Sequence, residues 1–119
     1  MTIKLGMVTF DTADAVALAA FWAKVVEGQV IDESDGWYVM VNSPNNVGLG
    51  FQKVMDPTPG KNKLHLDVSG ENYAAEQDRL KGIGAQWVAE HKEEFGTWTV
   101  FADPDGNQFC LGDAASFPM

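Results

Sequence analysis

Residues 96–113, GTWTVFADPDGNQFCLGD, repeat the pattern of residues 36–54, GWYVMVNSPNNVGLGFQKV. Each stretch has a glycine, a tryptophan, a strand-like run, a turn around a proline, and a phenylalanine in a second apolar run. In the turns SPNN and DPDG, proline fixes φ and asparagine or glycine accepts a positive φ. Each stretch therefore predicts two short strands joined by a turn.

The repeat extends upstream of each stretch. Residues 3–28 and 62–85 each begin with a short apolar strand, pass through polar residues, and continue as a helix that ends near Gly28 or Gly84. The two copies lie about 58 positions apart in the chain. We expect each copy to have the order β-α-β-β-β, which makes the fold α+β.

Polar residues before each helix are candidate caps. Asp11 or Thr12 is suited to cap the first helix, and Ser69 or Asn72 the second. Gly28 is suited to the left-handed conformation that ends the first helix.

The chain length predicts one domain, residues 1–119, built from two modules. We place the first module at residues 3–55 and the second at residues 62–113, joined by a proline- and glycine-containing linker at residues 56–63. Two such modules can pair their sheets and curl them around a central cleft, with the helices outside.

Charge and composition exclude several kinds of partner. Seventeen acidic and eight basic residues give a formal net charge of -9, which repels nucleic acid and anionic lipid. No apolar run reaches about 18 residues and the start of the chain lacks a secretory pattern, so we expect no membrane span and a cytoplasmic location. The charge cluster EHKEE, residues 90–94, predicts a solvated loop in which His91 is exposed and has no role.

The repeat also pairs residues that would face one another across the cleft. Met7 falls on His65, and Gln52 falls on Cys110. These four side chains are therefore candidate cleft residues.

Two segments carry a resemblance to a known family: PGKNKLHLDV, residues 59–68, and ADPDGNQFC, residues 102–110. With the repeat, they resemble the vicinal oxygen chelate superfamily of glyoxalases, bleomycin-resistance proteins and extradiol dioxygenases, and more narrowly its bacterial glyoxalase-like domains. The resemblance covers residues 3–112. It implies a glyoxalase-like fold and a homodimer, and it leaves the reaction open because the fold hosts isomerases, dioxygenases, thiol transferases and drug-binding proteins.

In metal-dependent members of this superfamily, four strand positions hold the ion. The resemblance transfers them to Met7, Gln52, His65 and Cys110. Relatives usually place histidine and glutamate there, whereas this chain keeps one histidine and no carboxylate among the four. We therefore expect no metal at the usual site. The alternative is zinc, nickel, iron or manganese held by His65 with Gln52 and Cys110.

His65 and Asp67 have several possible roles. His65 alternates with two leucines, so its side chain points away from theirs, either as a metal ligand or as a hydrogen-bonding acid or base. Asp67, two residues on, would share its face and either orient His65, pair with a cationic ligand, or end a solvent-exposed strand.

Cys110 and two tryptophans complete the candidate cleft. Because apolar neighbours flank Cys110 and no base is near in sequence, a buried, inert thiol is favoured over ligand contact and over a nucleophile. Trp37 and Trp98 stand at matching strand starts and either pack or stack on a planar or cationic ligand.

Three hypotheses follow. The first and favoured one is a metal-free small-molecule binding protein of drug-binding or resistance type. The second is a metal-dependent lyase, isomerase or dioxygenase acting on a small substrate with vicinal oxygens. The third is a metal-free enzyme with His65 as acid or base.

Overall fold

The computed structural model describes residues 5–60, 62 and 64–116. The chain divides into two compact units between Pro59 and Gly60, and each unit is a βαβββ module with its own four-stranded mixed sheet. The predicted α+β fold of two tandem modules is thus confirmed. The central cleft between the modules stays a prediction.

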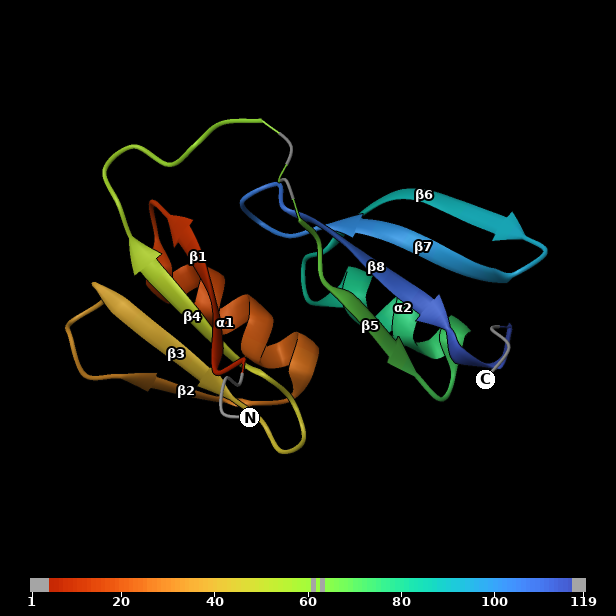
Figure 1. Ribbon diagram of the computed structural model, residues 1–119, viewed down its shortest axis with the longest axis horizontal. Coiled ribbons are helices and arrows are strands. Elements are labelled where there is room, and N and C mark those ends of the chain that lie inside the picture. Colours follow the sequence, from red (N-terminus) through yellow and green to blue (C-terminus); the bar gives the residue numbers. More distant parts are fainter. Residues whose placement is uncertain (1–4, 61, 63, 117–119) are drawn as a thin grey trace. The chain divides into compact units, whose positions relative to one another are not determined.

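The first module contains one helix and four strands, drawn from red to yellow in Figure 1. Its sheet has the order β1-β4-β3-β2, in which β1 runs parallel to β4 and the other pairs are antiparallel. Its elements are β1 (Met7–Thr12), α1 (Ala15–Val26), β2 (Gln29–Asp32), β3 (Tyr38–Asn42) and β4 (Gly48–Lys53).

The second module repeats this topology with the order β5-β8-β7-β6, in which β5 runs parallel to β8. A short 3-10 helix, η1 (Ala114–Ser116), follows its last strand. Its other elements are β5 (Asp67–Gly70), α2 (Tyr73–Gly82), β6 (Gln86–Glu93), β7 (Gly96–Ala102) and β8 (Gln108–Asp113).

The sequence predicted three strands after each helix but located only the last two. The structure identifies the missing ones as β2 and β6. The predicted loop at residues 90–94 is wrong, because Glu90 to Glu93 belong to β6 and pair with β7. A charged run is compatible with a strand here because β6 is an edge strand whose residues are almost all exposed.

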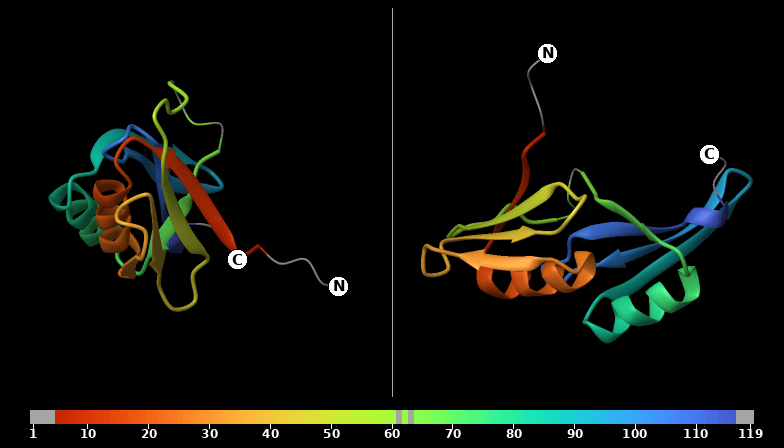
Figure 2. Two further views of the ribbon diagram at one scale, coloured as in Figure 1. Left: turned by 90° about the vertical axis from the view of Figure 1, so that its left-hand side faces the viewer. Right: turned by 90° about the horizontal axis from the view of Figure 1, so that it is seen from below.

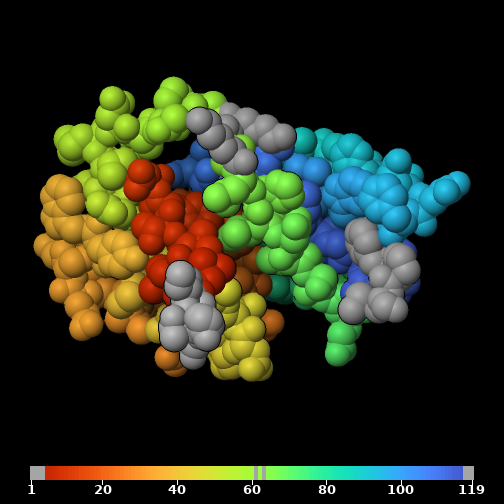
Figure 3. All heavy atoms as spheres, viewed as in Figure 1, coloured from red at the N-terminus to blue at the C-terminus, as the bar shows by residue number. Residues whose placement is uncertain are grey.

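The first part of the predicted linker lies in a surface segment. This segment, residues 54–60, is yellow-green in Figure 3 and mostly exposed, and its Met55, just before the predicted linker, is 87% exposed. Lys61 and Lys63 of the predicted linker, and residues 3 and 4 of the predicted first module, lie outside the described residues.

Each helix covers one face of its own sheet (Figure 2). In the first module Leu18 and Trp22 are buried against the sheet, and the ring of Phe10 stacks on Phe51 with centroids 5.0 Å apart. Alternation along a strand sends every second side chain to this face and leaves the next one on the open face.

The second helix has a thinner apolar stripe, in which only Leu80 is buried among the described residues. A polar contact supplements it: the Tyr73 hydroxyl donates to Glu90 Oε2 at 2.9 Å and contacts the Thr99 hydroxyl. Burial raises the pKa of Tyr73 above its ordinary value of 10.0, and the Thr99 hydrogen bond opposes this.

The helix ends differ partly from expectation. Asp14, rather than Asp11 or Thr12, caps α1 by accepting from the Ala17 amide at 3.0 Å, whereas Asn72 caps α2 as one of the two predicted candidates. The left-handed residue at the end of α1 is Glu27, with φ 55°, so the role predicted for Gly28 is wrong.

Gly28 is required for a different reason. A Cβ at this position would lie 2.6 Å from the carbonyl oxygen of Asn42, where β2 begins beside β3. We expect Gly28→Ala to lower the free energy of unfolding by more than about 1 kcal/mol, since backbone must move. Gly82→Ala is the matched control because its Cβ would meet nothing within 4 Å, and it should be neutral or raise stability by about 0.5–1 kcal/mol. Urea unfolding followed by circular dichroism measures both, and equal stabilities would contradict the assignment.

The Tyr73 contact predicts a dependence on alkaline pH. At neutral pH we expect Tyr73→Phe to be about 1 kcal/mol less stable than the unmodified chain, because it loses the bond to Glu90. The folded-state pKa is raised, so the unfolded chain ionises Tyr73 first, and this stability is lost as pH rises above the ordinary value. The difference between the two proteins should therefore shrink in urea titrations at increasing alkaline pH. A constant difference would contradict the raised pKa.

Candidate functional site

The open face of the second sheet forms a pocket of about 540 Å³. Phe109 and Leu111 of β8 are buried on the helix side, so the intervening Cys110 points to the open side. Strand pairing places Asp67 opposite Cys110 and Trp98 opposite Gly112, which brings these residues to the same face. The pocket walls include His65, Asp67, Ser69, Phe95, Trp98 and Cys110.

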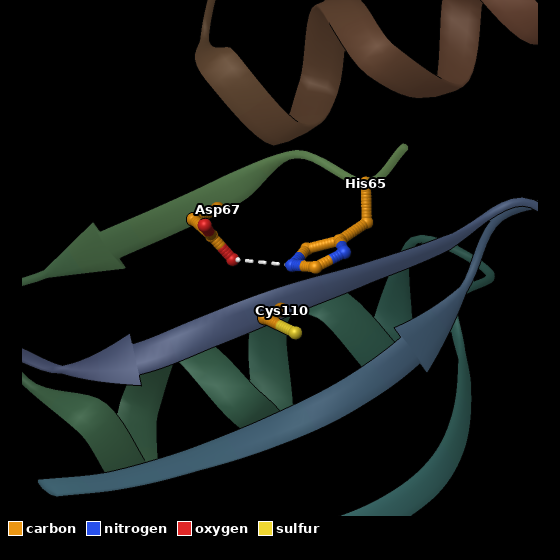
Figure 4. A group of neighbouring side chains, drawn as sticks. All are labelled: His65, Asp67 and Cys110. Carbon is orange, nitrogen blue, oxygen red and sulfur yellow. Dashed lines mark ion pairs between the residues drawn. The ribbon is translucent and has the colours of Figure 1, made fainter. Parts of the chain in front are cut away.

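Three chemically active side chains lie close together at this wall. His65 Nε2 is 3.3 Å from Asp67 Oδ1, and the donor atoms of His65, Asp67 and Cys110 all lie within 4.8 Å of one another. Figure 4 shows the three side chains converging, with Asp67 on β5, His65 just before it, and Cys110 on β8. The side chains of His65 and Asp67 are 53% and 74% exposed, so they are accessible from solvent.

Asn62, which sequence analysis did not single out, holds the segment that carries His65. Its Oδ1 accepts from the Gln108 amide at 2.9 Å, and its Nδ2 donates to the Gln108 carbonyl at 3.2 Å. The same Nδ2 contacts the carbonyl of Leu64, and the Cys110 amide donates to the carbonyl of Leu66 at 2.9 Å. These bonds extend the β5–β8 pairing upstream and place His65 beside Cys110.

An aromatic stack forms another wall. The Trp98 ring stacks on His91, with centroids 5.2 Å apart, and on Phe95, with centroids 5.6 Å apart. The prediction that His91 is exposed is confirmed, but it is not without a role, because it supports Trp98. Phe95 is 58% exposed and was missed because it follows a run of charged residues.

The candidate residues of the first module do not form a comparable cluster. Met7 pairs with Gly48 and Gln52 pairs with Asp11, so they share a face but lie four residues apart in the β1–β4 register. That is roughly 13 Å along the strand, which argues against one ion shared by this pair. Trp37 is exposed, and Lys53 Nζ lies 4.9 Å from its ring centroid.

The strand register also changes the pairing of the two copies. Thr9 and Asp67 each precede their helix cap by five residues, so they are counterparts. Thr9 pairs with Gly50, as Asp67 pairs with Cys110. The counterpart of Cys110 is therefore Gly50, two residues from the predicted Gln52.

In the first module the phenol of Tyr38 fills the space beside Gly50, the counterpart of Cys110. A Cβ on Gly50 would lie 2.2 Å from the Tyr38 hydroxyl oxygen, which is 3.1 Å from Thr9 Oγ1. The first module thus has hydroxyl groups where the second has a thiol and a carboxylate.

The four metal positions implied by the resemblance do not fit a metal centre of the usual kind. Glutamine and methionine are neutral donors, and the two lie far apart along their strands. Asp67, which is not one of the four, brings a carboxylate within reach of His65 and Cys110.

The sequence matches the glyoxalase-like domain family over residues 7–112, and the chain belongs to this family. A comparison with curated proteins finds no match. Among the described residues, none of the helices is long and apolar enough to cross a membrane.

Solved structures share the fold at low sequence identity. A glyoxalase/bleomycin resistance protein/dioxygenase family enzyme from Burkholderia phytofirmans PsJN is 20% identical, with a TM-score of 0.78 over 93% of this chain and 98% of that one. TnmS3, an antibiotic-binding protein from Streptomyces sp. CB03234, is 19% identical, with a TM-score of 0.71 over 95% and 98%. The oxidase ChaP-H2 is 19% identical, with a TM-score of 0.61 over 95% and 94%. These matches show the fold and span both binding proteins and enzymes.

The expectation of a buried thiol is wrong, because Cys110 is partly exposed and lines the pocket. We expect a disulfide reagent such as 5,5′-dithiobis(2-nitrobenzoate) to modify one thiol per native chain, since Cys110 is the only cysteine. Absorbance of the released thiolate measures the reaction, and Cys110→Ala should abolish it. Modification that begins only in denaturing urea would contradict the exposed position.

Proposed function

We propose that the chain is a small-molecule binding protein of drug- or metabolite-binding type, and that its ligand is a flat aromatic cation. One observation carries the proposal: the Trp98 ring and the Asp67 carboxylate line the same pocket. The ring offers a stacking surface, and the carboxylate offers the opposite charge.

The pocket has the size and lining that small ligands use. Its volume of about 540 Å³ falls inside the range of roughly 300–1,000 Å³ that is typical for such sites. Trp98 is in ring contact with His91 and with Phe95 and is still partly exposed, so a ligand that stacks on its exposed part meets an ordered ring. Because little side-chain freedom remains to be lost, binding costs less conformational entropy.

Charge favours a cationic ligand. The Asp67 side chain is 74% exposed, and its described side-chain contact is with His65. The net charge of -9 adds an attractive field over the whole chain. The antibiotic-binding neighbour TnmS3 supports the class of function through the shared fold alone.

A cytoplasmic location and a homodimer belong to the same proposal. The first rests on the single cysteine, which needs no oxidising compartment, and the second rests on the family resemblance. Light scattering decides the dimer, and the mass of one 13.0 kDa chain would refute it.

A second candidate function is acid–base catalysis by His65. The contact between His65 Nε2 and Asp67 Oδ1 at the pocket wall favours it, because a carboxylate can orient an imidazole. Mass spectrometry of each bound compound after incubation tests it. A product that forms with the unmodified chain and disappears with His65→Gln would establish catalysis, and recovery of every compound unchanged would reject it.

The binding proposal is tested with proflavine, a planar aromatic cation. We expect proflavine to quench tryptophan fluorescence saturably, and Trp98→Leu to raise its dissociation constant about tenfold, the equivalent of one lost cation–π contact. Asp67→Asn should weaken binding less and reduce its dependence on salt.

Trp37→Leu is the matched control, because Trp37 is an exposed tryptophan of the other module beside Lys53. Its dissociation constant for proflavine should equal that of the unmodified chain. Unchanged binding in Trp98→Leu, or a loss confined to Trp37→Leu, would overturn the proposal.

A further inference from the structure

We propose that His65, Asp67 and Cys110 form a binding site for a thiophilic divalent cation of the zinc class, contained in the second module and open on one side to the pocket. The site does not require the small-molecule function proposed above. It shares His65 and Cys110 with the four positions implied by the resemblance, but it adds Asp67 and uses no residue of the first module.

The spacing of the first two donors already suits a tetrahedral ion. Ligand atoms that each lie about 2.0–2.1 Å from such an ion are separated by roughly 3.3 Å. His65 Nε2 and Asp67 Oδ1 are 3.3 Å apart. An ion could therefore be bound between them with little change in either side chain.

The strand register supplies the third donor. Asp67 and Cys110 are direct partners in the parallel pair β5–β8, so their side chains leave the same face of the sheet. The three donor atoms lie within 4.8 Å of one another, and the exposed side chains of His65 and Asp67 are free to rotate the remaining distance. The bonds from Asn62 to Gln108 hold the backbone that carries His65.

The donor types select the ion. Imidazole nitrogen, carboxylate oxygen and thiolate sulfur suit zinc and its analogue cobalt, whereas magnesium and manganese prefer oxygen donors. On binding, the Cys110 thiol loses its proton to solvent and the sulfur bonds to the metal. The thiolate and the Asp67 carboxylate then offset the two positive charges. Three protein ligands leave a fourth position open toward the pocket, as in zinc sites that bind a further group.

Cobalt(II) tests the site because a thiolate–cobalt bond has its own charge-transfer absorption. Titration of the reduced full-length chain with cobalt chloride should give this band with one equivalent of metal, and zinc chloride should remove it whereas magnesium chloride should not. Cys110→Ala should lose the band, and Asp67→Asn and His65→Gln should each weaken zinc binding at least tenfold in competition with a chelator. Bound zinc should also slow modification of Cys110 by the disulfide reagent.

Met7→Leu and Gln52→Ala are the matched controls, because both residues belong to the set implied by the resemblance but lie in the first module. They should keep the band and the zinc affinity. Circular dichroism without metal checks that each variant remains folded, which is expected since the substituted side chains of the second module are wholly or partly exposed. No band in the unmodified chain, or loss of the band in either control variant, would overturn the proposal.

The experiments separate this inference from the proposed function. Proflavine binding is measured with a chelator present, and Trp98→Leu should keep the cobalt band because the ring supplies no metal ligand. A chain that binds proflavine without forming the band refutes the metal site alone. A chain that forms the band without binding proflavine supports the metal site and refutes the binding proposal alone.

Discussion

The chemistry of the second module depends on the parallel pairing of β5 with β8. Parallel strands cannot be joined by a tight turn, so α2, β6 and β7 intervene between Asp67 and Cys110, which then become direct neighbours. The same register sends Phe109 and Leu111 under α2. A slip of one residue would put Cys110 in the core and an apolar side chain in the pocket, so core packing and site chemistry are fixed together.

The two modules share a topology but not a site. At the place of Asp67 and Cys110, the first module has Thr9 and Gly50, and the Tyr38 phenol occupies the space that a side chain on Gly50 would need. The repeated scaffold explains why both sheets have one covered and one open face. Whether the open face of a sheet carries reactive groups depends on individual side chains. A shared fold therefore does not determine function.

The sequence predicted the parts of the fold that follow from local rules. The repeat gave the module order, and the DPDG turn forms as expected, with the buried Asp103 carboxylate accepting from the Asn107 amide at 2.8 Å. The sequence could not predict the register of the parallel strands, because no local signal determines which residue of β1 pairs with which residue of β4. It also misjudged Cys110, since alternation predicts which face a side chain takes but not whether another element covers that face. The charged β6 was misjudged because ladder hydrogen bonds belong to the backbone, and side-chain polarity does not forbid them at an edge.

The two proposals for the pocket are coupled through charge. Without a metal, the Asp67 carboxylate at this wall would attract the proposed cationic ring to Trp98. With a zinc-class ion bound, the thiolate and the carboxylate only balance its charge, so the wall becomes neutral and its attraction for cations falls. The open coordination position then favours a ligand with an oxygen or nitrogen donor beside its ring. The same wall would thus select different ligands in its two states, and metal content, rather than pocket shape, would decide which class binds.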